Sequence, residues 1–214
     1  SPANPTGVVM RDAELESVCG WCDQHGVRLI MDEIYHGLSF EERAQSALAF
    51  TDNAIIINSF SKYFCMTGWR LGWVVLPDDL VEPAERLAQN LYISAPTANQ
   101  MGAIAAFDCY DELDAHIPRY QENRDLLYRG LPKEFLGGHA PSDGAFYLYA
   151  DVSAITNDSV AFAGRLLAET GVAITPGVDF DGCYGKTHVR LSYAGSTKEM
   201  KNAVLRINAW LPEA

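Results

Sequence analysis

The most constraining feature of the sequence is a polar stretch, residues 59–72, that lies between two apolar runs. Residues 54–57 before it and 73–76 after it each have the length and composition of a buried strand. Lys62 therefore sits on a turn between two core strands, with Arg70 eight residues further on. Because an unpaired ammonium group is costly in apolar surroundings, a charge at this position requires a reason. The alternative is a surface lysine whose stem covers apolar atoms while its charge reaches water.

A second motif follows a predicted strand. Residues 27–31 are apolar and favour a strand, and Asp32 and Tyr35 come directly after it. In open α/β sheets, ligands bind at the carboxyl ends of the strands, which makes both side chains candidates for a site. Taken alone, Asp32 is better explained as a cap for the next turn. His36 is interpreted as structural.

Two further motifs lie near the ends of the chain. Residues 4–7, Asn-Pro-Thr-Gly, predict a turn, because proline excludes the preceding Asn4 from the α region and glycine closes the turn. Residues 188–193 predict a strand that carries one outstanding charge, Arg190. In isolation, the first motif is most simply a bare turn and the second a surface arginine.

Taken together, these motifs resemble those of the class I/II aminotransferases, the fold-type I enzymes that use pyridoxal 5'-phosphate (PLP). The likeness rests on N-P-T-G, D-E-I-Y, S-F-S-K, G-W-R-L-G and V-R-L-S, which occur in this order across the chain. It implies a homodimeric enzyme of amino acid metabolism that moves an amino group between an α-amino acid and a 2-oxo acid.

The resemblance also implies roles for the first motif residues. Lys62 is expected to form the Schiff base with PLP and then to carry a proton on the substrate–cofactor adduct. Asp32 is expected to pair with the pyridinium nitrogen, where a carboxylate keeps the ring protonated and able to accept electrons. Asn4 and Tyr35 are expected to hydrogen-bond the phenolic oxygen of the cofactor.

Phosphate and carboxylate binding fall to the remaining motif residues. By resemblance, Ser59 and Arg70 hold the cofactor phosphate, with Ser61 as a weaker candidate. Arg190 binds the substrate α-carboxylate. The planar fork of a guanidinium group suits both anions because it donates two parallel hydrogen bonds.

The expected fold is α/β, in two domains. Residues 1–120 are predicted to be the C-terminal part of the PLP-transferase large domain, a mostly parallel sheet with helices. Residues 121–214 are predicted to form an α+β small domain. Family members are longer than this chain, which begins without methionine. We therefore expect it to be the C-terminal half or so of such an enzyme, weakly active or inactive by itself.

Several helices are predicted from apolar periodicity and from cap residues. Pro83 is expected to open one helix, and Pro118 to kink or restart another. Ser196 and Glu199 have the spacing of a capping box. The predicted helices cover residues 11–25, 85–91, 98–110, 111–131 and 158–170, and a last helix follows Ser196.

Composition narrows the function classes. The formal charge of −12 argues against nucleic-acid and anionic-membrane surfaces. No apolar run approaches the roughly 20 residues of a membrane span. The five scattered cysteines indicate a reducing, cytoplasmic environment. Cys19 and Cys22 form a C-x-x-C pattern but lie on the apolar side of a predicted helix, so core packing is favoured over a redox or metal site.

Two alternatives stay open at this point. A PLP-dependent lyase of the same fold shares the cofactor cradle, and a non-catalytic PLP-fold regulatory module can retain it. Among aminotransferases, specificity for aspartate is disfavoured, because no Arg or Lys lies between Arg86 and Arg119 to recognise a side-chain carboxylate.

Overall fold

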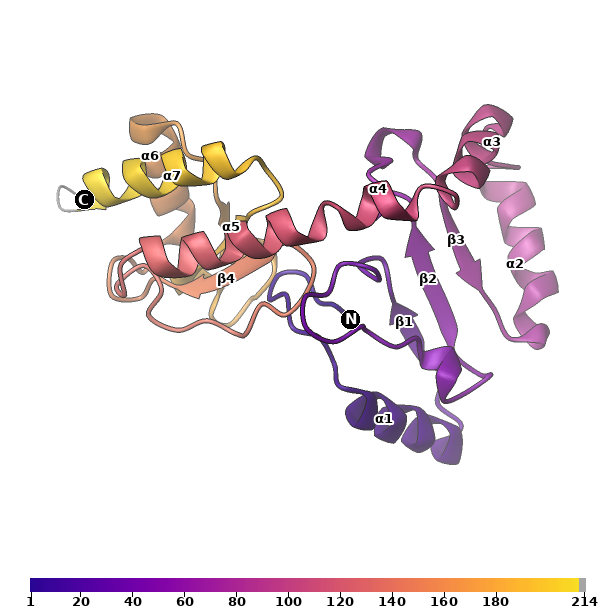
Figure 1. Ribbon diagram of the computed structural model, residues 1–214. Helices are drawn as coiled ribbons and strands as arrows, with labels where there is room; N and C mark the ends of the chain where they lie inside the picture. The colour runs from indigo at the N-terminus through magenta and orange to yellow at the C-terminus, as the bar shows by residue number, and fades with distance from the viewer. Residues whose placement is uncertain (212–214) are drawn as a thin grey trace. The chain divides into compact units, whose positions relative to one another are not determined.

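The structure is a computed structural model that describes residues 1–211. It divides into two compact units, each with its own sheet (Figure 1). The first contains Ser1–Pro2 and Val9–Ala115, and the second contains Ala3–Val8 and the chain from His116 onward. The predicted domains, 1–120 and 121–214, differ from these units chiefly in the placement of Ala3–Val8. Among the described residues, none of the helices has the length and apolarity of a membrane-crossing segment.

The first unit is built on a three-stranded sheet in the order β1-β2-β3. β1 pairs with β2 in parallel, and β2 pairs with β3 antiparallel. The prediction of a mostly parallel sheet therefore does not hold for these strands. The connection from β2 to β3 contains the lysine turn and one 3₁₀ turn but no crossover helix, so the chain reverses direction. The elements are α1 (Asp12–His25), β1 (Ile30–Asp32), η1 (Ala47–Ala49), β2 (Ile55–Ser59), η2 (Thr67–Trp69), β3 (Gly72–Val75), α2 (Asp78–Leu91), α3 (Thr97–Ala106) and α4 (Tyr110–Asp114).

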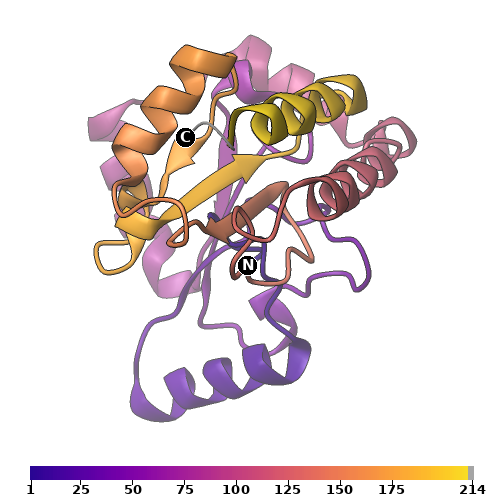
Figure 2. The same cartoon turned by 90° about the vertical axis from the view of Figure 1, so that its left-hand side faces the viewer.

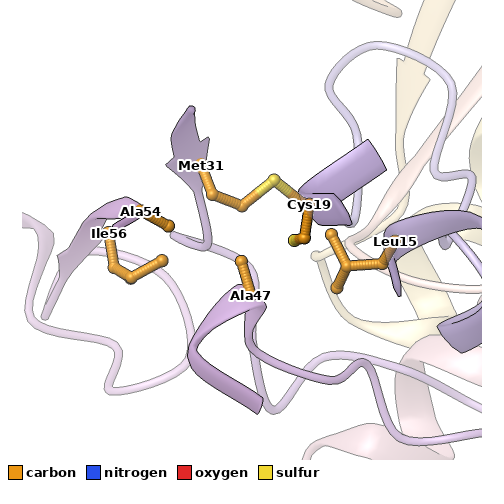
Figure 3. Packing of buried hydrophobic residues seen from close by; sticks show 6 residues of the cluster. All are labelled: Leu15, Cys19, Met31, Ala47, Ala54 and Ile56. Carbon is orange, nitrogen blue, oxygen red and sulfur yellow. The ribbon is translucent and has the colours of Figure 1, made fainter. Parts of the chain in front are cut away.

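The core of this unit lies where α1 packs against the sheet. Figure 3 shows side chains from α1, β1, β2, η1 and the residue before β2 converging: Leu15, Cys19, Met31, Ala47, Ala54 and Ile56. Both cysteines of the C-x-x-C pattern are buried as free thiols, which confirms the prediction that they pack in the core. This packing fixes β1 and β2, whose ends carry the candidate site.

The second unit has a three-stranded antiparallel sheet in the order β4-β6-β5. Helix α7 packs beside both α5 and α6, and the three helices accompany this sheet (Figures 1 and 2). The elements are α5 (Ile117–Gly130), β4 (Tyr147–Asp151), α6 (Ser159–Thr170), β5 (Thr175–Pro176), η3 (Gly177–Asp179), η4 (Gly185–Thr187), β6 (His188–Ser192) and α7 (Thr197–Trp210).

Side chains alternate along β4 and β6, so the sheet of the second unit has one apolar face and one polar face. Leu148 opposes Leu191 in the register of the two strands, and both are buried. Tyr149 opposes Arg190 one position along each strand. Because successive side chains of a strand point to opposite faces, Arg190 lies on the face away from this apolar layer.

Most helix boundaries follow their predicted signals. Gly26 and Gly171 end α1 and α6 in the left-handed conformation, and the Ser196 capping box starts α7. Pro118 lies in the first turn of α5, so a new helix starts there, as expected. The prediction for Pro83 is wrong, because α2 already begins at Asp78 and Pro83 lies inside it. Acidic residues in that first turn favour the earlier start.

Candidate active site

The first group of predicted site residues gathers at one edge of the first sheet. Because β1 and β2 are parallel, their carboxyl ends meet there. Asp32 is the last residue of β1, is exposed, and accepts a 3.0 Å hydrogen bond from the N–H of Ile34 through Oδ1. Ser59 is the last residue of β2, and Lys62 follows in the next turn. The sheet therefore delivers a carboxylate, a hydroxyl and an amine to the same edge.

Lys62 has a partner from the same predicted set. Its Nζ lies 5.7 Å from the centroid of the Tyr35 ring, a cation–π arrangement. Tyr35 is buried and stands in the turn after β1. Lys62 itself is half-buried, so its amine is held beside the site instead of extending along the surface.

The two serines of the lysine motif form one cluster of polar atoms. Oγ of Ser59 lies 3.0 Å from Oγ of Ser61 and accepts the N–H of Ser61 at 3.0 Å. It also lies 3.1 Å from the carbonyl oxygen of Leu71, to which it donates. Hydroxyls and a backbone N–H at a loop are the donor types that bind phosphate oxygens.

Arg70 stands next to this loop in a conformation that arginine seldom adopts. Its φ is +51°, in the left-handed region, and its Nη1 donates a 3.0 Å bond to the carbonyl oxygen of Thr67. Strained backbone of this kind is concentrated at functional sites. Arg70 is exposed, and within residues 1–211 no carboxylate pairs with it. The serines and this unneutralised arginine therefore suit the phosphate of PLP.

The second group of site residues lies in the second unit, around Arg190. The guanidinium carbon lies 4.3 Å from the centroid of the Tyr147 ring and 4.5 Å from that of Phe180. Nη1 donates to Oδ1 of Asn4 at 2.7 Å, and Nη2 to Oγ1 of Thr175 at 3.3 Å. Nε is buried without a hydrogen-bond partner, and no carboxylate in the described part of the chain pairs with the group. The result is a fixed cation with capacity left for an anion.

This contact also orients the amide of Asn4. A guanidinium group has donors only, so Asn4 must present Oδ1 to Arg190. Its Nδ2 is then left to donate elsewhere, and Asn4 is exposed. That donor matches the phenolic oxygen of PLP expected from the sequence. The predicted residues thus form two groups: Asn4 and Arg190 in the second unit, and Asp32, Tyr35, Ser59, Ser61, Lys62 and Arg70 in the first.

Comparison with known proteins establishes the family. The model of the family "Aminotransferase class I and II" matches residues 1–207. The chain belongs to this family. The motif-based identification is thereby confirmed, as is PLP as the cofactor of the family.

Individual relatives agree with this assignment. The chain is 47% identical to a valine–pyruvate aminotransferase of Mycobacterium tuberculosis, over 99% of the chain and 56% of that protein. It is 35% identical to an aspartate aminotransferase of Sulfurisphaera tokodaii, over 99% of the chain and 55% of that protein. A crystal structure of an aminotransferase from M. tuberculosis superposes with a TM-score of 0.95 and 47% identity, covering 100% of this chain and 56% of the other. The chain thus spans about half the length of the curated relatives it matches.

The class I/II motifs also contain an acidic residue to which sequence reasoning gave no role. Glu33 is buried, with 2% exposed, and its Oε1 accepts the N–H of Ala47 at 2.9 Å. Its Oε2 lies 3.3 Å from Nδ1 of His36. Burial lowers the pKa of His36, and the Glu33 carboxylate partly opposes that shift. The contacts of Glu33 and His36 therefore fix the turn that carries Asp32 and Tyr35. In the sequence, the role of Glu33 was signalled only by its position next to Asp32.

The residues around Arg190 were also missed as site residues. Tyr147, Thr175 and Phe180 come from β4, β5 and the segment after η3. Tyr147 and Thr175 reach Arg190 through the pairing of β4 and β5 with β6, and Phe180 follows β5 by way of η3. No local pattern in the sequence marks them as its partners.

Proposed function

We propose that the protein to which this chain belongs is a PLP-dependent aminotransferase that moves an amino group between an α-amino acid and a 2-oxo acid. The observation that carries the proposal is the setting of Arg190. Its guanidinium is held between two rings and bonded to Asn4 and Thr175, yet no carboxylate in residues 1–211 neutralises it. A fixed guanidinium of this kind binds planar carboxylates with two parallel hydrogen bonds. The α-carboxylate is the group that amino acids and 2-oxo acids share.

Lys62 is assigned the covalent and proton-transfer role. It is a primary amine at the sheet edge that also carries Asp32, which is where ligands of α/β sheets bind. When bound, PLP supplies an electron sink for the substrate α-carbon. Lys62 holds the cofactor and moves the proton at that carbon.

The other predicted site residues hold and tune the cofactor. Asp32 keeps the ring nitrogen protonated, because a nearby carboxylate favours the charged form of a base. Tyr35 and Asn4 donate to the phenolic oxygen. Ser59 and Arg70, with Ser61, bind the phosphate.

For the substrate, we propose an amino donor with an uncharged side chain. The relative with 47% identity is named for valine and pyruvate. The chain has no Arg or Lys between Arg86 and Arg119, so this stretch offers no cation for a second carboxylate. The aspartate aminotransferase of S. tokodaii is the less similar of the two relatives, at 35%.

We further propose that the enzyme is a cytoplasmic homodimer. All five cysteines are free thiols, which supports a reducing compartment. On and after α2 and α3, large apolar side chains are strongly exposed, as expected of a face that packs against protein outside this chain. They include Leu87, Leu91, Ile93, Met101 and Ile104.

The test is chemical labelling of the full-length protein. PLP is added, the visible absorbance is recorded, and borohydride reduction is followed by peptide mapping. We expect one pyridoxyl group, on Lys62, and its loss in Lys62→Ala but not in Lys201→Ala, which removes an exposed lysine of α7. The loaded protein should then convert valine with pyruvate faster than aspartate with 2-oxoglutarate. Label spread over many lysines, or none on Lys62, would refute the proposal.

A further inference from the structure

Ser142 is a fully buried polar residue with no part in the proposed chemistry. It is 0% exposed, and its hydroxyl donates to the carbonyl oxygen of Tyr147 at 2.7 Å. The same hydroxyl lies 2.6 Å from Oη of Tyr193. Because a serine hydroxyl has one hydrogen, Tyr193 must be the donor in that contact. The backbone of Ser142 is also fixed, since its carbonyl accepts a 3.1 Å bond from Nη1 of Arg124.

Gly7 packs directly on this hydroxyl. An ideal Cβ on Gly7 would lie 2.5 Å from Oγ of Ser142 and 2.9 Å from the carbonyl oxygens of both Gly144 and Tyr147. Gly7 also has a φ of +74°, which a residue with a side chain adopts only at a cost. The glycine of the N-P-T-G motif is thus required for its close approach to Ser142 as well as for the turn.

Backbone bonds make residues 3–8, here called the Asn4 loop, one closed structure on this support. The N–H of Gly7 bonds to the carbonyl of Ala3 at 2.8 Å, and the N–H of Ala3 bonds to that of Val8 at 3.0 Å. The N–H of Gly144 donates to the carbonyl of Gly7 at 2.9 Å. The position of Asn4 is therefore set by where Gly7 rests.

Ser142 reaches the Arg190 site by two routes. Through Gly7 it supports the Asn4 loop, and Asn4 bonds Arg190. Through its bond to the carbonyl of Tyr147 it holds the residue whose ring stacks on the same guanidinium. Both routes lie within the second unit.

We propose that Ser142 is a positioning residue that holds the Asn4 loop and Tyr147 together on Arg190, so that the amide of Asn4 points its Nδ2 donor at the cofactor. The inference rests on the proposed function, in which Asn4 meets the phenolic oxygen of PLP. Ser142 itself touches neither cofactor nor substrate. It acts through Gly7 and Tyr147.

Loss of the hydroxyl should loosen this arrangement in a measurable way. Ser142→Ala removes one buried hydrogen bond from the Tyr147 carbonyl and one from the Tyr193 hydroxyl, which favours local opening. A hydrogen bond to the anionic form of a phenol stabilises that form. Weakening the Asn4 donor therefore raises the pH at which the visible absorbance of bound PLP changes. The substitution leaves the charged side chain of Arg124 in place.

The experiment uses the full-length protein and four variants. Ser142→Ala and Tyr193→Phe remove the two bonded hydroxyls, and Asn4→Ala removes the donor itself. Ser159→Ala is the matched control, because Ser159 is 1% exposed and its hydroxyl donates to Gly185 at 2.7 Å, away from the Asn4 loop. Two quantities are measured: amide hydrogen exchange of residues 3–8 without cofactor, and the pH midpoint of PLP absorbance with it.

We expect exchange of the Gly7 and Ala3 amides to become about tenfold faster in Ser142→Ala. The absorbance midpoint should rise in the same direction as in Asn4→Ala, but by less. Tyr193→Phe should show both effects at smaller size, and Ser159→Ala should show neither.

Several results would overturn the inference. If Ser142→Ala lowers thermal stability as Ser159→Ala does but leaves loop exchange and midpoint unchanged, Ser142 is structural only. If Ser142→Ala does not fold, Tyr193→Phe decides on the same two readouts. If the wild type carries PLP on Lys62 while Asn4→Ala leaves the midpoint unchanged, the assigned role of Asn4 fails. In that case, amide hydrogen exchange of residues 3–8 without cofactor is the one readout that tests whether Ser142 supports the Asn4 loop.

Discussion

Oδ1 of Asn4 accepts a 2.7 Å hydrogen bond from Nη1 of Arg190, across 186 positions of sequence. This hydrogen bond thus links Asn4, the proposed hydrogen-bond donor to the cofactor, with Arg190, the proposed binding residue for the substrate carboxylate. Because Arg190 can only donate, the bond also fixes which end of the Asn4 amide faces outward. Substitution of either residue is therefore expected to disturb both binding functions.

Arg190→Lys should weaken substrate binding more than turnover. Lysine keeps the charge but loses the planar fork and the stacking between Tyr147 and Phe180. We expect KM for both amino acid and 2-oxo acid to rise about 10- to 100-fold in the full-length enzyme, the size of lost charge-assisted hydrogen bonds. Arg165→Lys, on an exposed arginine paired with Glu169, is the control and should leave KM unchanged. Equal KM values for wild type and Arg190→Lys would contradict the assignment.

Glu33→Ala should destabilise the protein strongly. It leaves the N–H of Ala47 without its acceptor and His36 without its carboxylate, in a buried place. We expect a loss of about 2 to 4 kcal/mol in the free energy of unfolding, measured by denaturant titration. Glu33→Gln retains an acceptor oxygen and should lose less. Glu16→Ala, at an exposed position of α1, controls for the change of residue type.

Glu199→Ala should show a stability loss that depends on pH. The N–H and hydroxyl of Ser196 bond the Glu199 carboxylate at 2.9 and 2.8 Å and lower its pKa. A carboxyl group whose pKa is lowered by folding stabilises the protein above its unfolded pKa, about 4.3 for glutamate. That contribution disappears as the pH falls through the folded pKa. Wild type should therefore unfold at a higher temperature than Glu199→Ala at pH 7, and the gap should shrink as the pH falls below the unfolded pKa.

Thermal shifts at pH 7, 4 and 3 measure this effect. Glu16→Ala again serves as the control, with a difference from wild type that stays the same at all three values. A gap for Glu199→Ala that is as large at pH 3 as at pH 7 would show that the capping carboxylate is not its source.

The 214 residues alone should be weakly active or inactive. The chain spans 56% of its relative from M. tuberculosis, and within residues 1–211 the outer edges of β1 and β3 have no strand partner. We expect amino transfer by the isolated chain to be at least about 100-fold slower than by the full-length protein, because a site lacking positioning groups loses that much or more. Ordinary aminotransferase rates from the isolated chain would show that the rest is dispensable.

The sequence was sufficient where the signal is local. The glycine at position 26, the spacing of Ser196 and Glu199, and the motif around Lys62 each act within a few residues, so helix ends and family could be predicted. The buried C-x-x-C followed from helical periodicity alone. These features depend little on the rest of the fold.

Features set by distant parts of the chain were beyond such reasoning. Gly7 rests on Ser142, and Phe180 covers Arg190, although the residues of each pair are separated in sequence and come together only in the folded chain. The antiparallel pairing of β2 and β3 depends on how the lysine turn reverses, which periodicity does not report. Pro83 shows that a strong local signal can also mislead. Proline favours the start of a helix, but α2 had already begun at Asp78.

Because Ala3–Val8 belongs with the chain after His116, the second unit is discontinuous in sequence. Recombination between two relatives at any junction from Val9 to Ala115 would therefore combine the Asn4 loop of one parent with the Arg190 strand of the other. Such chimaeras should fail wherever the parents differ at the positions of Gly7 or Ser142, which contact each other across that junction. Shuffling of this family is expected to succeed when both stretches come from the same parent.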